Sequence, residues 1–188
     1  MNTQPWRLNL IAIAATLTFA PLQHSEALVA QTVTSSPCAA DSNFQRLAFW
    51  VGDWEVLDSA GKHYANQRVR AAVDKCAITA EWSGRVGDKG LNVSAYDVSS
   101  RDWKQVYVGN QVPSPLGVEI RKSDPSYGGP GIRFISLLDA PAGNLRRSRI
   151  TIMPVSSDRV QQLFETSSDG GTTWRTLFKA DFRRLADS

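Results

Sequence analysis

Alternation of apolar and polar residues is the main periodic pattern along this chain. It is clearest near the C-terminus, where Trp174, Phe178 and Phe182 fall on one side of an extended segment and Arg175 and Arg183 fall on the other. Successive side chains of a β-strand point to opposite faces, so we expect this aromatic face to point into a core. Apart from one short segment, no stretch sustains the spacing of an amphipathic helix. The pattern predicts an all-β protein.

About ten short segments carry the strand pattern, and residues such as Gly, Pro, Asp and Ser separate most of them. Short strands at this spacing are typical of a β-sandwich or of an up-and-down barrel. The expected strands are 53–58, 64–73, 76–82, 91–98, 103–109, 116–121, 132–138, 144–153, 159–166 and 173–185.

The segment Asn43–Val56, with the sequence NFQRLAFWVGDWEV, changes its periodicity at Gly52. Phe49 and Trp50, before the glycine, partly fit a helical spacing, whereas strict alternation begins after it, with Trp54 among the first apolar positions. We therefore expect a short helical plug that runs directly into the first strand.

The strand 103–109 has two mixed faces. Trp103, Gln105 and Tyr107 share one face, and Val106 and Val108 share the other with a lysine. Such mixing is expected where a barrel encloses a partly polar cavity and its outside is partly covered. It is also expected of an ordinary strand that is buried on both sides.

The N-terminus has the three-part pattern of a secretory signal peptide. Arg7 precedes an apolar run from Leu8 to Ala20, and small residues then suit cleavage after Ala27 or, less well, after Ala30. This apolar run is shorter than a membrane-spanning helix, which needs about 20 residues. We expect a cleaved signal, export to the periplasm or beyond the cell, and no stable membrane insertion.

Removal of the signal leaves about 160 residues, which is the usual size of one domain. The net charge is +3, and most charges are interspersed rather than gathered into a basic stripe. Nucleic-acid binders usually show such a stripe, so we expect no nucleic-acid partner. The sequence leaves the oligomeric state open.

Two cysteines follow the signal, Cys38 and Cys76, and a pair in an exported protein is more often bridged than free. A disulfide between them would tie the N-terminal tail to a strand. A zinc site is the alternative, but His63 is the single histidine after the signal, so the ligand set is poor. We expect a disulfide, no metal and no cofactor.

The most specific short motif is SSDGGTTW, from Ser167 to Trp174, which resembles the Asp-box hairpins of sialidases and other β-proteins. Asp169 can accept hydrogen bonds from turn amides, Gly171 permits a positive φ, and Trp174 can anchor the hairpin in the core. In those families the box is structural, and sialidases carry several copies on a much longer propeller. We expect a structural hairpin rather than a glycosidase site.

Catalytic constellations are sparse. A nucleophilic triad would have to use His63, which lies in a polar stretch typical of a hairpin tip. No glycine-rich loop precedes a helix, so the chain offers no phosphate-binding platform. Glu81 or Tyr107 could act as an acid–base group, but spacing alone does not distinguish them from structural residues.

A set of aromatic and polar residues on the expected strands could line an interior. Small-molecule sites are mostly apolar with a few placed polar groups, and a buried arginine matches a carboxylate. Each residue by itself fits an ordinary core or surface position better than a binding site. The candidate ligand-binding residues are Trp82, Trp103, Gln105, Tyr107, Arg149, Gln162 and Phe164.

Several of these motifs together resemble a family of exported bacterial proteins of uncharacterised function. The shared marks are the opening FWVGDWEV, a Cys strand with Glu81 and Trp82, a Trp-x-Gln-x-Tyr strand at Trp103, a basic strand with Arg149, a Val-x-Gln strand at Gln162, and the SDGGxxW hairpin. The Gly-x-Trp opening after a short helix is also similar to that of lipocalins and other calycin barrels. The chain departs from lipocalins in its later motifs, its strand number and its Asp-box hairpin.

This resemblance implies a single calycin-like antiparallel β-barrel of about 8–10 strands with a short N-terminal helical plug. Phe49, Trp50, Gly52 and Trp54 would then be structural residues that close one end. The implied organisation is a signal peptide at 1–30, a flexible N-terminal tail at 31–42 and a β-barrel domain at 43–186.

The barrel would bind a small hydrophobic or amphipathic ligand. A solid structural or interaction protein of the envelope and a calycin-type enzyme remain alternatives.

Overall fold

The computed structural model describes residues 36–110, 118–136 and 146–186. The expected signal peptide, both cleavage sites and the first part of the expected tail lie outside these residues. So do the outermost residues of three expected strands, at 116–117, 137–138 and 144–145.

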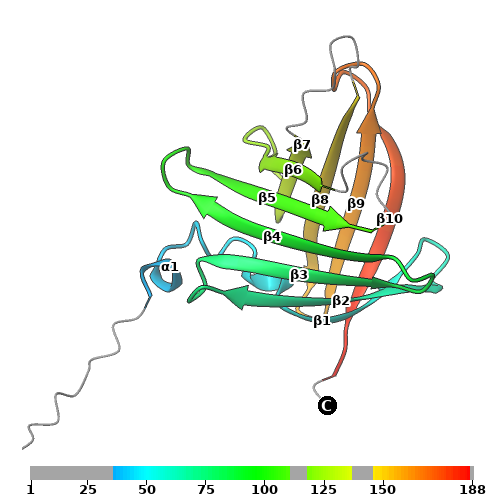
Figure 1. Ribbon diagram of the computed structural model, residues 1–188, viewed down its shortest axis with the longest axis horizontal. Coiled ribbons are helices and arrows are strands. Elements are labelled where there is room, and N and C mark those ends of the chain that lie inside the picture. The colour runs from blue at the N-terminus through cyan, green and yellow to red at the C-terminus, as the bar shows by residue number, and fades with distance from the viewer. Residues whose placement is uncertain (1–35, 111–117, 137–145, 187–188) are drawn as a thin grey trace, which may run out of the picture. The chain divides into compact units, whose positions relative to one another are not determined.

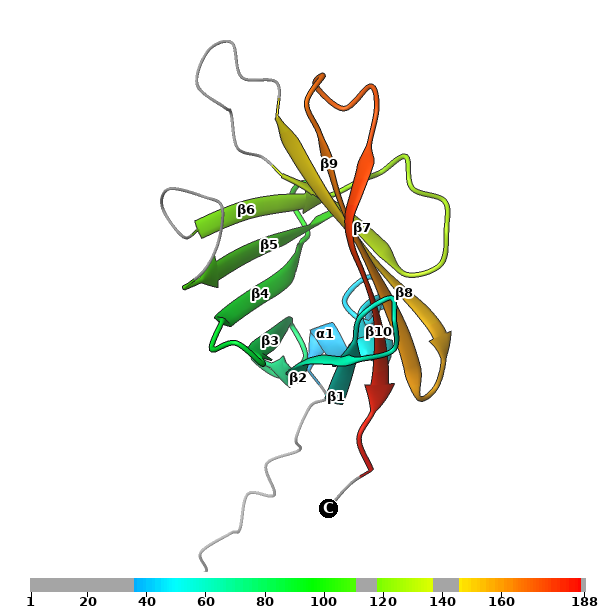
Figure 2. The ribbon, with the colours of Figure 1, turned by 90° about the vertical axis from the view of Figure 1, so that its right-hand side faces the viewer.

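Ten antiparallel strands close into one barrel, in which each strand pairs with its neighbours in sequence and β1 pairs with β10 (Figure 1). This confirms the all-β prediction and decides for the barrel over the sandwich. Strands β2–β6 form one wall and β7–β10 the other (Figure 2). The strands are β1 (Gly52–Leu57), β2 (His63–Ala72), β3 (Ala77–Gly84), β4 (Lys89–Asp97), β5 (Asp102–Gly109), β6 (Val118–Ser123), β7 (Ile132–Ser136), β8 (Arg147–Ser156), β9 (Arg159–Ser167) and β10 (Arg175–Arg184).

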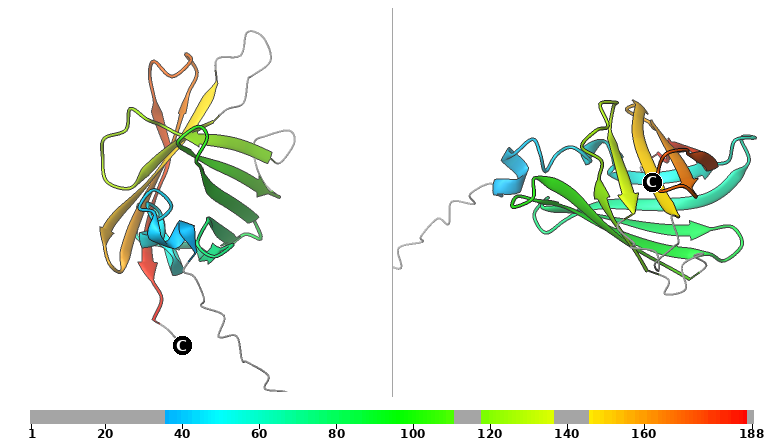
Figure 3. Two further views of the ribbon diagram at one scale, coloured as in Figure 1. Left: turned by 90° about the vertical axis from the view of Figure 1, so that its left-hand side faces the viewer. Right: turned by 90° about the horizontal axis from the view of Figure 1, so that it is seen from above.

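A short N-terminal segment closes one end of the barrel, which we call the plug end. It contains the helical turn α1 (Pro37–Ala40) and the 3-10 turn η1 (Ala48–Trp50), and Figure 3 shows α1 at this end. Leu47 and Trp50 are completely buried in the core. The indole of Trp103 on β5 donates a hydrogen bond to the carbonyl of Asn43 at 3.1 Å. The plug segment is thus fixed to the strands by packing and by hydrogen bonds.

Trp54 joins the plug to the first strand. Its ring is fully buried, its indole donates to the carbonyl of Trp50 at 2.9 Å, and the guanidinium of Arg184 lies 4.3 Å from its centre. Gly52 has a φ of +152°, and a Cβ there would lie 2.0 Å from the Arg184 guanidinium. Only glycine leaves room for this stack. The tryptophans of the opening motif therefore hold the closed end of the barrel together.

The core fills the plug end and the middle of the barrel. Most of its residues come from β1–β3 and from β7–β10, on both walls, so the core forms only when the ring closes. The fully buried apolar side chains inside the barrel are Trp54, Val56, Ala65, Val69, Ala80, Ile132, Phe134, Ile152, Val160, Ala180 and Phe182.

The disulfide between Cys38 and Cys76 is present and anchors α1 to the turn before β3. Residues 36–42, which were expected to be flexible, are thus held by a covalent bond and a buried Cys38. The bond indicates an oxidising, non-cytoplasmic environment. Among the described residues, no helix is both long and apolar enough to cross a bilayer.

Replacing both cysteines with alanine should lower the free energy of unfolding by about 3–4 kcal/mol, because the bond closes a 38-residue separation and its loss frees the unfolded chain. Urea unfolding followed by tryptophan fluorescence measures the change. The wild-type protein under a reducing agent is the control and should match the variant. A loss below about 1 kcal/mol would show that the bond does not restrict the unfolded state.

Candidate functional site

Three neighbouring strands place their polar residues inside the barrel and their apolar residues outside. On β4, Ser94 is fully buried, whereas Val93 is 42% exposed. On β5, Gln105 is buried and Val106 exposed, and β6 repeats the pattern with Arg121 and Ile120. Alternation along a strand gives two faces of different polarity, but here the polar one faces the core. The inner wall of β4–β6 is therefore a built polar surface within a largely apolar barrel.

The inward polar side chains of these strands lie beside one another in register. Asn92, Tyr107 and Glu119 are direct neighbours on β4, β5 and β6. Ser94, Gln105 and Arg121 form the next row of neighbours on the same strands, closer to the plug. Ser148 reaches the same wall from β8. We call this set the polar panel: Asn92, Ser94, Gln105, Tyr107, Glu119, Arg121 and Ser148.

Arg121 is the centre of the hydrogen-bond network in the polar panel. One of its terminal amines donates to the side-chain oxygen of Gln105 at 2.8 Å, and the other pairs with the carboxylate of Glu119. Gln105 donates in turn to Ser94 at 3.1 Å, and the hydroxyl of Ser148 donates to Glu119. Both charges are almost completely buried, at 5% exposure for the arginine and 7% for the glutamate. A buried pair of this kind needs such extra hydrogen bonds to offset its desolvation.

Tyr107 lies next to this pair, with its ring centre 5.7 Å from the Arg121 guanidinium. Burial raises the pKa of its phenol above the ordinary value, against the opposing effect of the Arg121 charge. The phenol therefore stays protonated at neutral pH and can donate a hydrogen bond. Gly90 on β4 makes room for the ring, because a Cβ there would lie 2.5 Å from the phenol oxygen.

Three deeply buried polar side chains inside the barrel each keep one atom without a hydrogen-bond partner. They are Oε1 of Gln67, Oδ1 of Asn92 and Nε of Arg121, and Nε1 of Trp50 in the plug segment is a fourth such atom among the described residues. The three residues are between 4% and 8% exposed. Unpaired buried polar atoms are rare in folded proteins and costly, so each requires an explanation.

Aromatic side chains gather at the end of the barrel opposite the plug. The ring of Tyr64 lies 5.9 Å from that of Trp82 on β3 and 4.9 Å from that of Phe178 on β10. The indole of Trp82 donates to the carboxylate of Asp88 at 2.6 Å, which fixes its orientation. This cluster gives the polar panel an apolar neighbour at the same end.

Most of the residues proposed from sequence face the interior, but not all at the same place. Gln105 and Tyr107 belong to the polar panel. Gln162 and Phe164 alternate inward with Val160 on β9. Trp82 lies in the aromatic cluster. Trp103 is part of the closed plug end, since its indole donates a hydrogen bond to the plug segment. Ligand contact by any of these residues stays a prediction.

Arg149 points away from the interior, and this corrects its expected position. Ile150 and Ile152 pack inward on β8, so alternation sends Arg149 to the outer face. There it forms two hydrogen bonds to Glu165 on β9, at 2.6 and 2.8 Å, and lies 4.1 Å from the ring centre of Trp174. It is therefore not the interior arginine.

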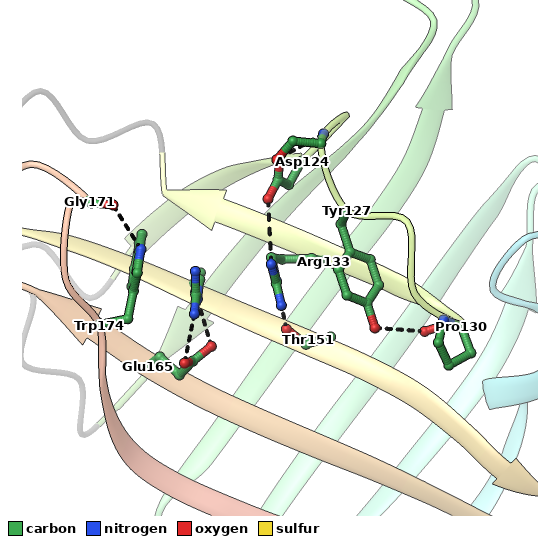
Figure 4. A network of polar contacts seen from close by, with 10 residues as sticks. Asp124, Tyr127, Pro130, Arg133, Thr151, Glu165, Gly171 and Trp174 are labelled. Carbon is green, nitrogen blue, oxygen red and sulfur yellow. Dashed lines mark hydrogen bonds and ion pairs between the residues drawn. The ribbon is translucent and has the colours of Figure 1, made fainter.

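The outer wall of β7–β9 carries a second stack of the same kind. Arg133 lies 4.3 Å from the ring centre of Tyr127, donates to Thr151 at 3.1 Å and pairs with Asp124 (Figure 4). Figure 4 shows Trp174 over the same wall. Both arginines are already neutralised and covered by an aromatic ring, which fits a structural role.

The SSDGGTTW segment forms the turn between β9 and β10, as its pattern predicts. Hydrogen bonds from the hydroxyl and amide of Thr173 and from the hydroxyl of Ser167 hold the pKa of Asp169 well below its ordinary value. Gly171 has a φ of +99° and accepts a hydrogen bond from the indole of Trp174. Trp174 lies on the outer wall rather than in the core, because the pairing of β9 and β10 shifts register beyond it.

The polar panel contains residues that the sequence did not single out: Glu119, Arg121, Asn92, Ser94 and Ser148. The same holds for Gln67, which is buried on β2. The sequence VEIRKS of β6 does alternate, but hydrophobicity favours Val118 and Ile120 as the inward residues. One signal in the sequence could have pointed to the polar panel: polar and apolar residues alternate on three consecutive strands. It indicates that the faces differ without saying which one is inside.

Other features of the described residues offer weaker sites. An open groove of about 880 Å³ on the outside of β1–β3 is lined by charges of both signs, and Asp53 within it is already paired with Arg68 and Arg70. Glu81, a possible acid–base residue, is exposed on that outer face and not beside Tyr107. The described chain contains no group of three or more His, Cys, Asp or Glu residues that could hold a metal.

Comparisons with protein-family models and with curated proteins give no match to this chain. The fold and the polar panel are therefore the observations from which a function can be argued.

Proposed function

We propose that this protein is an exported, calycin-like carrier or receptor that holds a small amphipathic molecule inside its barrel. The polar head of the molecule lies at the polar panel and its apolar part lies along Trp82, Phe164 and Phe178. The signal-peptide pattern supports export, and the disulfide is consistent with it. The resemblance of the opening motif supports the calycin-like assignment.

The observation that carries the proposal is the set of unpaired buried atoms on Gln67, Asn92 and Arg121. A wall that served only to pack the barrel would be more stable with apolar side chains, because each unpaired polar atom costs about 1–3 kcal/mol. Binding sites, in contrast, present a few oriented polar groups within an apolar lining. A ligand head group that pairs with these atoms removes the cost.

A purified sample from an exporting host provides the first test. Native mass spectrometry beside the denatured mass reveals a co-purified ligand, and the denatured mass shows whether the chain begins after Ala27 or Ala30. Independently, the fluorescence of the uncharged probe N-phenylnaphthylamine should increase on binding the barrel, and decanol should displace it. A probe that neither brightens nor alters tryptophan fluorescence would count against an interior site.

Asn92→Leu should separate binding from folding. It removes an unpaired acceptor, so the free energy of unfolding should stay the same or rise by about 1 kcal/mol. The affinity for decanol should fall about five- to tenfold, the value of one hydrogen bond. Urea unfolding and probe displacement measure the two effects.

Asn66→Leu is the matched control, since Asn66 is exposed and points outward on β2. It should leave the affinity for decanol unchanged. Equal decanol binding by wild type and Asn92→Leu would remove the polar panel from the site.

A further inference from the structure

The polar panel is electrically neutral, and this limits the ligands that it can take. Its one cation, Arg121, pairs with its one anion, Glu119, and both are almost completely buried. The two terminal amines of the arginine are occupied by Glu119 and Gln105. The guanidinium therefore does not offer the two-pronged face with which arginine binds a carboxylate.

The unpaired atoms show which hydrogen bonds a ligand must supply. Oε1 of Gln67 and Oδ1 of Asn92 are acceptors, so they need donors, while Nε of Arg121 is a donor and needs one acceptor. The side chains come from β2, β4 and β6, and small Ala80 on β3 lies beside Asn92 in register. To satisfy this set, a head group would need both donors and an acceptor.

A carboxylate head group fits the set poorly. Ionised, it has acceptors but no donor, so the oxygens of Gln67 and Asn92 would stay unpaired. It would also bring a second negative charge beside Glu119 in a buried place, where an uncompensated charge is strongly disfavoured. The charge balance of the wall thus selects against fatty acids.

We infer that the barrel interior binds an uncharged amphiphile whose head group carries both hydrogen-bond donors and an acceptor, such as a primary amide or a glycerol ester, and discriminates against the matching carboxylate. This inference rests on the proposed function and names its ligand class. Glu119 is the residue that sets the discrimination, since it neutralises Arg121.

Decanamide and decanoate test the inference, because they have the same chain and nearly the same shape and differ in charge and donors. At about pH 8, where decanoate is ionised, displacement of N-phenylnaphthylamine from the wild-type protein should show at least tenfold tighter binding of decanamide. Decanoate that binds equally or more tightly would overturn the inference. If the probe binds but the two competitors do not differ, the ligand class fails while the proposed function stands. If the probe itself does not bind, the proposed function fails first.

Glu119→Gln gives a second test, because this variant should lose the preference that the wild-type protein shows. The substitution keeps the shape and hydrogen-bonding oxygen but leaves Arg121 with an uncompensated positive charge. The preference for decanamide over decanoate should then fall at least tenfold or reverse. An unchanged ratio would overturn the role of Glu119. Should this variant not fold, the wild-type ratio alone decides.

Glu165→Gln is the matched control. Glu165 is equally buried at 7% exposure and also pairs with an arginine, but it lies on the outer wall. Its substitution should leave the ratio of the two affinities as in the wild type. A shift of equal size in this variant would show that net charge, and not the interior pair, sets the preference.

Discussion

Trp54→Ala should lower the free energy of unfolding by about 5 kcal/mol, at the upper end for removal of a buried aromatic ring. The ring is fully buried, and its loss also leaves the Trp50 carbonyl without its donor and Arg184 without its stacking partner. Because the plug and β1 meet at this residue, the cavity cannot collapse without moving both. Urea unfolding measures the loss.

Trp54→Phe is the control for volume. It keeps most of the apolar ring but removes the hydrogen bond, so we expect a loss of roughly 2 kcal/mol. A loss of less than about 2 kcal/mol for the alanine variant would show that the plug end relaxes around the missing ring. It would also weaken the view that the opening motif is a device for stability.

Arg121→Met should destabilise the protein by about 4 kcal/mol, because it leaves the Glu119 carboxylate buried and unpaired. The loss comes from the stranded charge and not from the removal of a strongly stabilising pair. The double variant Glu119→Gln/Arg121→Met has no stranded charge and should recover most of the stability. The free energies of unfolding of the two single variants and the double variant form a double-mutant cycle.

The double-mutant cycle shows whether the polar panel is buried or accessible to water. If water reaches Glu119 freely, Arg121→Met should cost less than about 1 kcal/mol, as for an exposed ion pair, and the double variant should show no recovery. That result would contradict the buried, low-dielectric panel on which the proposed discrimination between ligands depends.

Several elements of the fold follow from local sequence patterns. Turn residues separate the strands, the periodicity changes at Gly52, and the Asp-box motif closes a hairpin, so ten strands and a plug were predictable. The disulfide was predictable from the signal-peptide pattern and from the lack of further cysteines and of histidines near the two cysteines in the sequence. Each of these predictions depends on residues that are close in sequence or on the expected oxidising compartment. None of them depends on the closure of the barrel.

The orientation of strand faces needed the tertiary structure. Ile120 and Arg121 alternate in the same way whether the barrel places one or the other inside, and hydrophobicity favours the wrong answer. Arg121 can be buried because Gln105 lies opposite it in register, Glu119 lies two residues before it, and Ser148 arrives at Glu119 from β8. Such pairing is non-local, so no single strand contains the information.

Arg149 and Trp174 illustrate the same point on the outer wall. Their sequence contexts fitted an interior arginine and a core anchor, but Ile150 and Ile152 occupy the inside of β8, and a register shift after Thr176 turns Trp174 outward. The sequence by itself determined the all-β class, the plug and the disulfide, because these depend on local periodicity and composition. Only the closed barrel decided which face of β4–β6 lines the interior, because the burial of a charge is favourable only where its partners from other strands meet it.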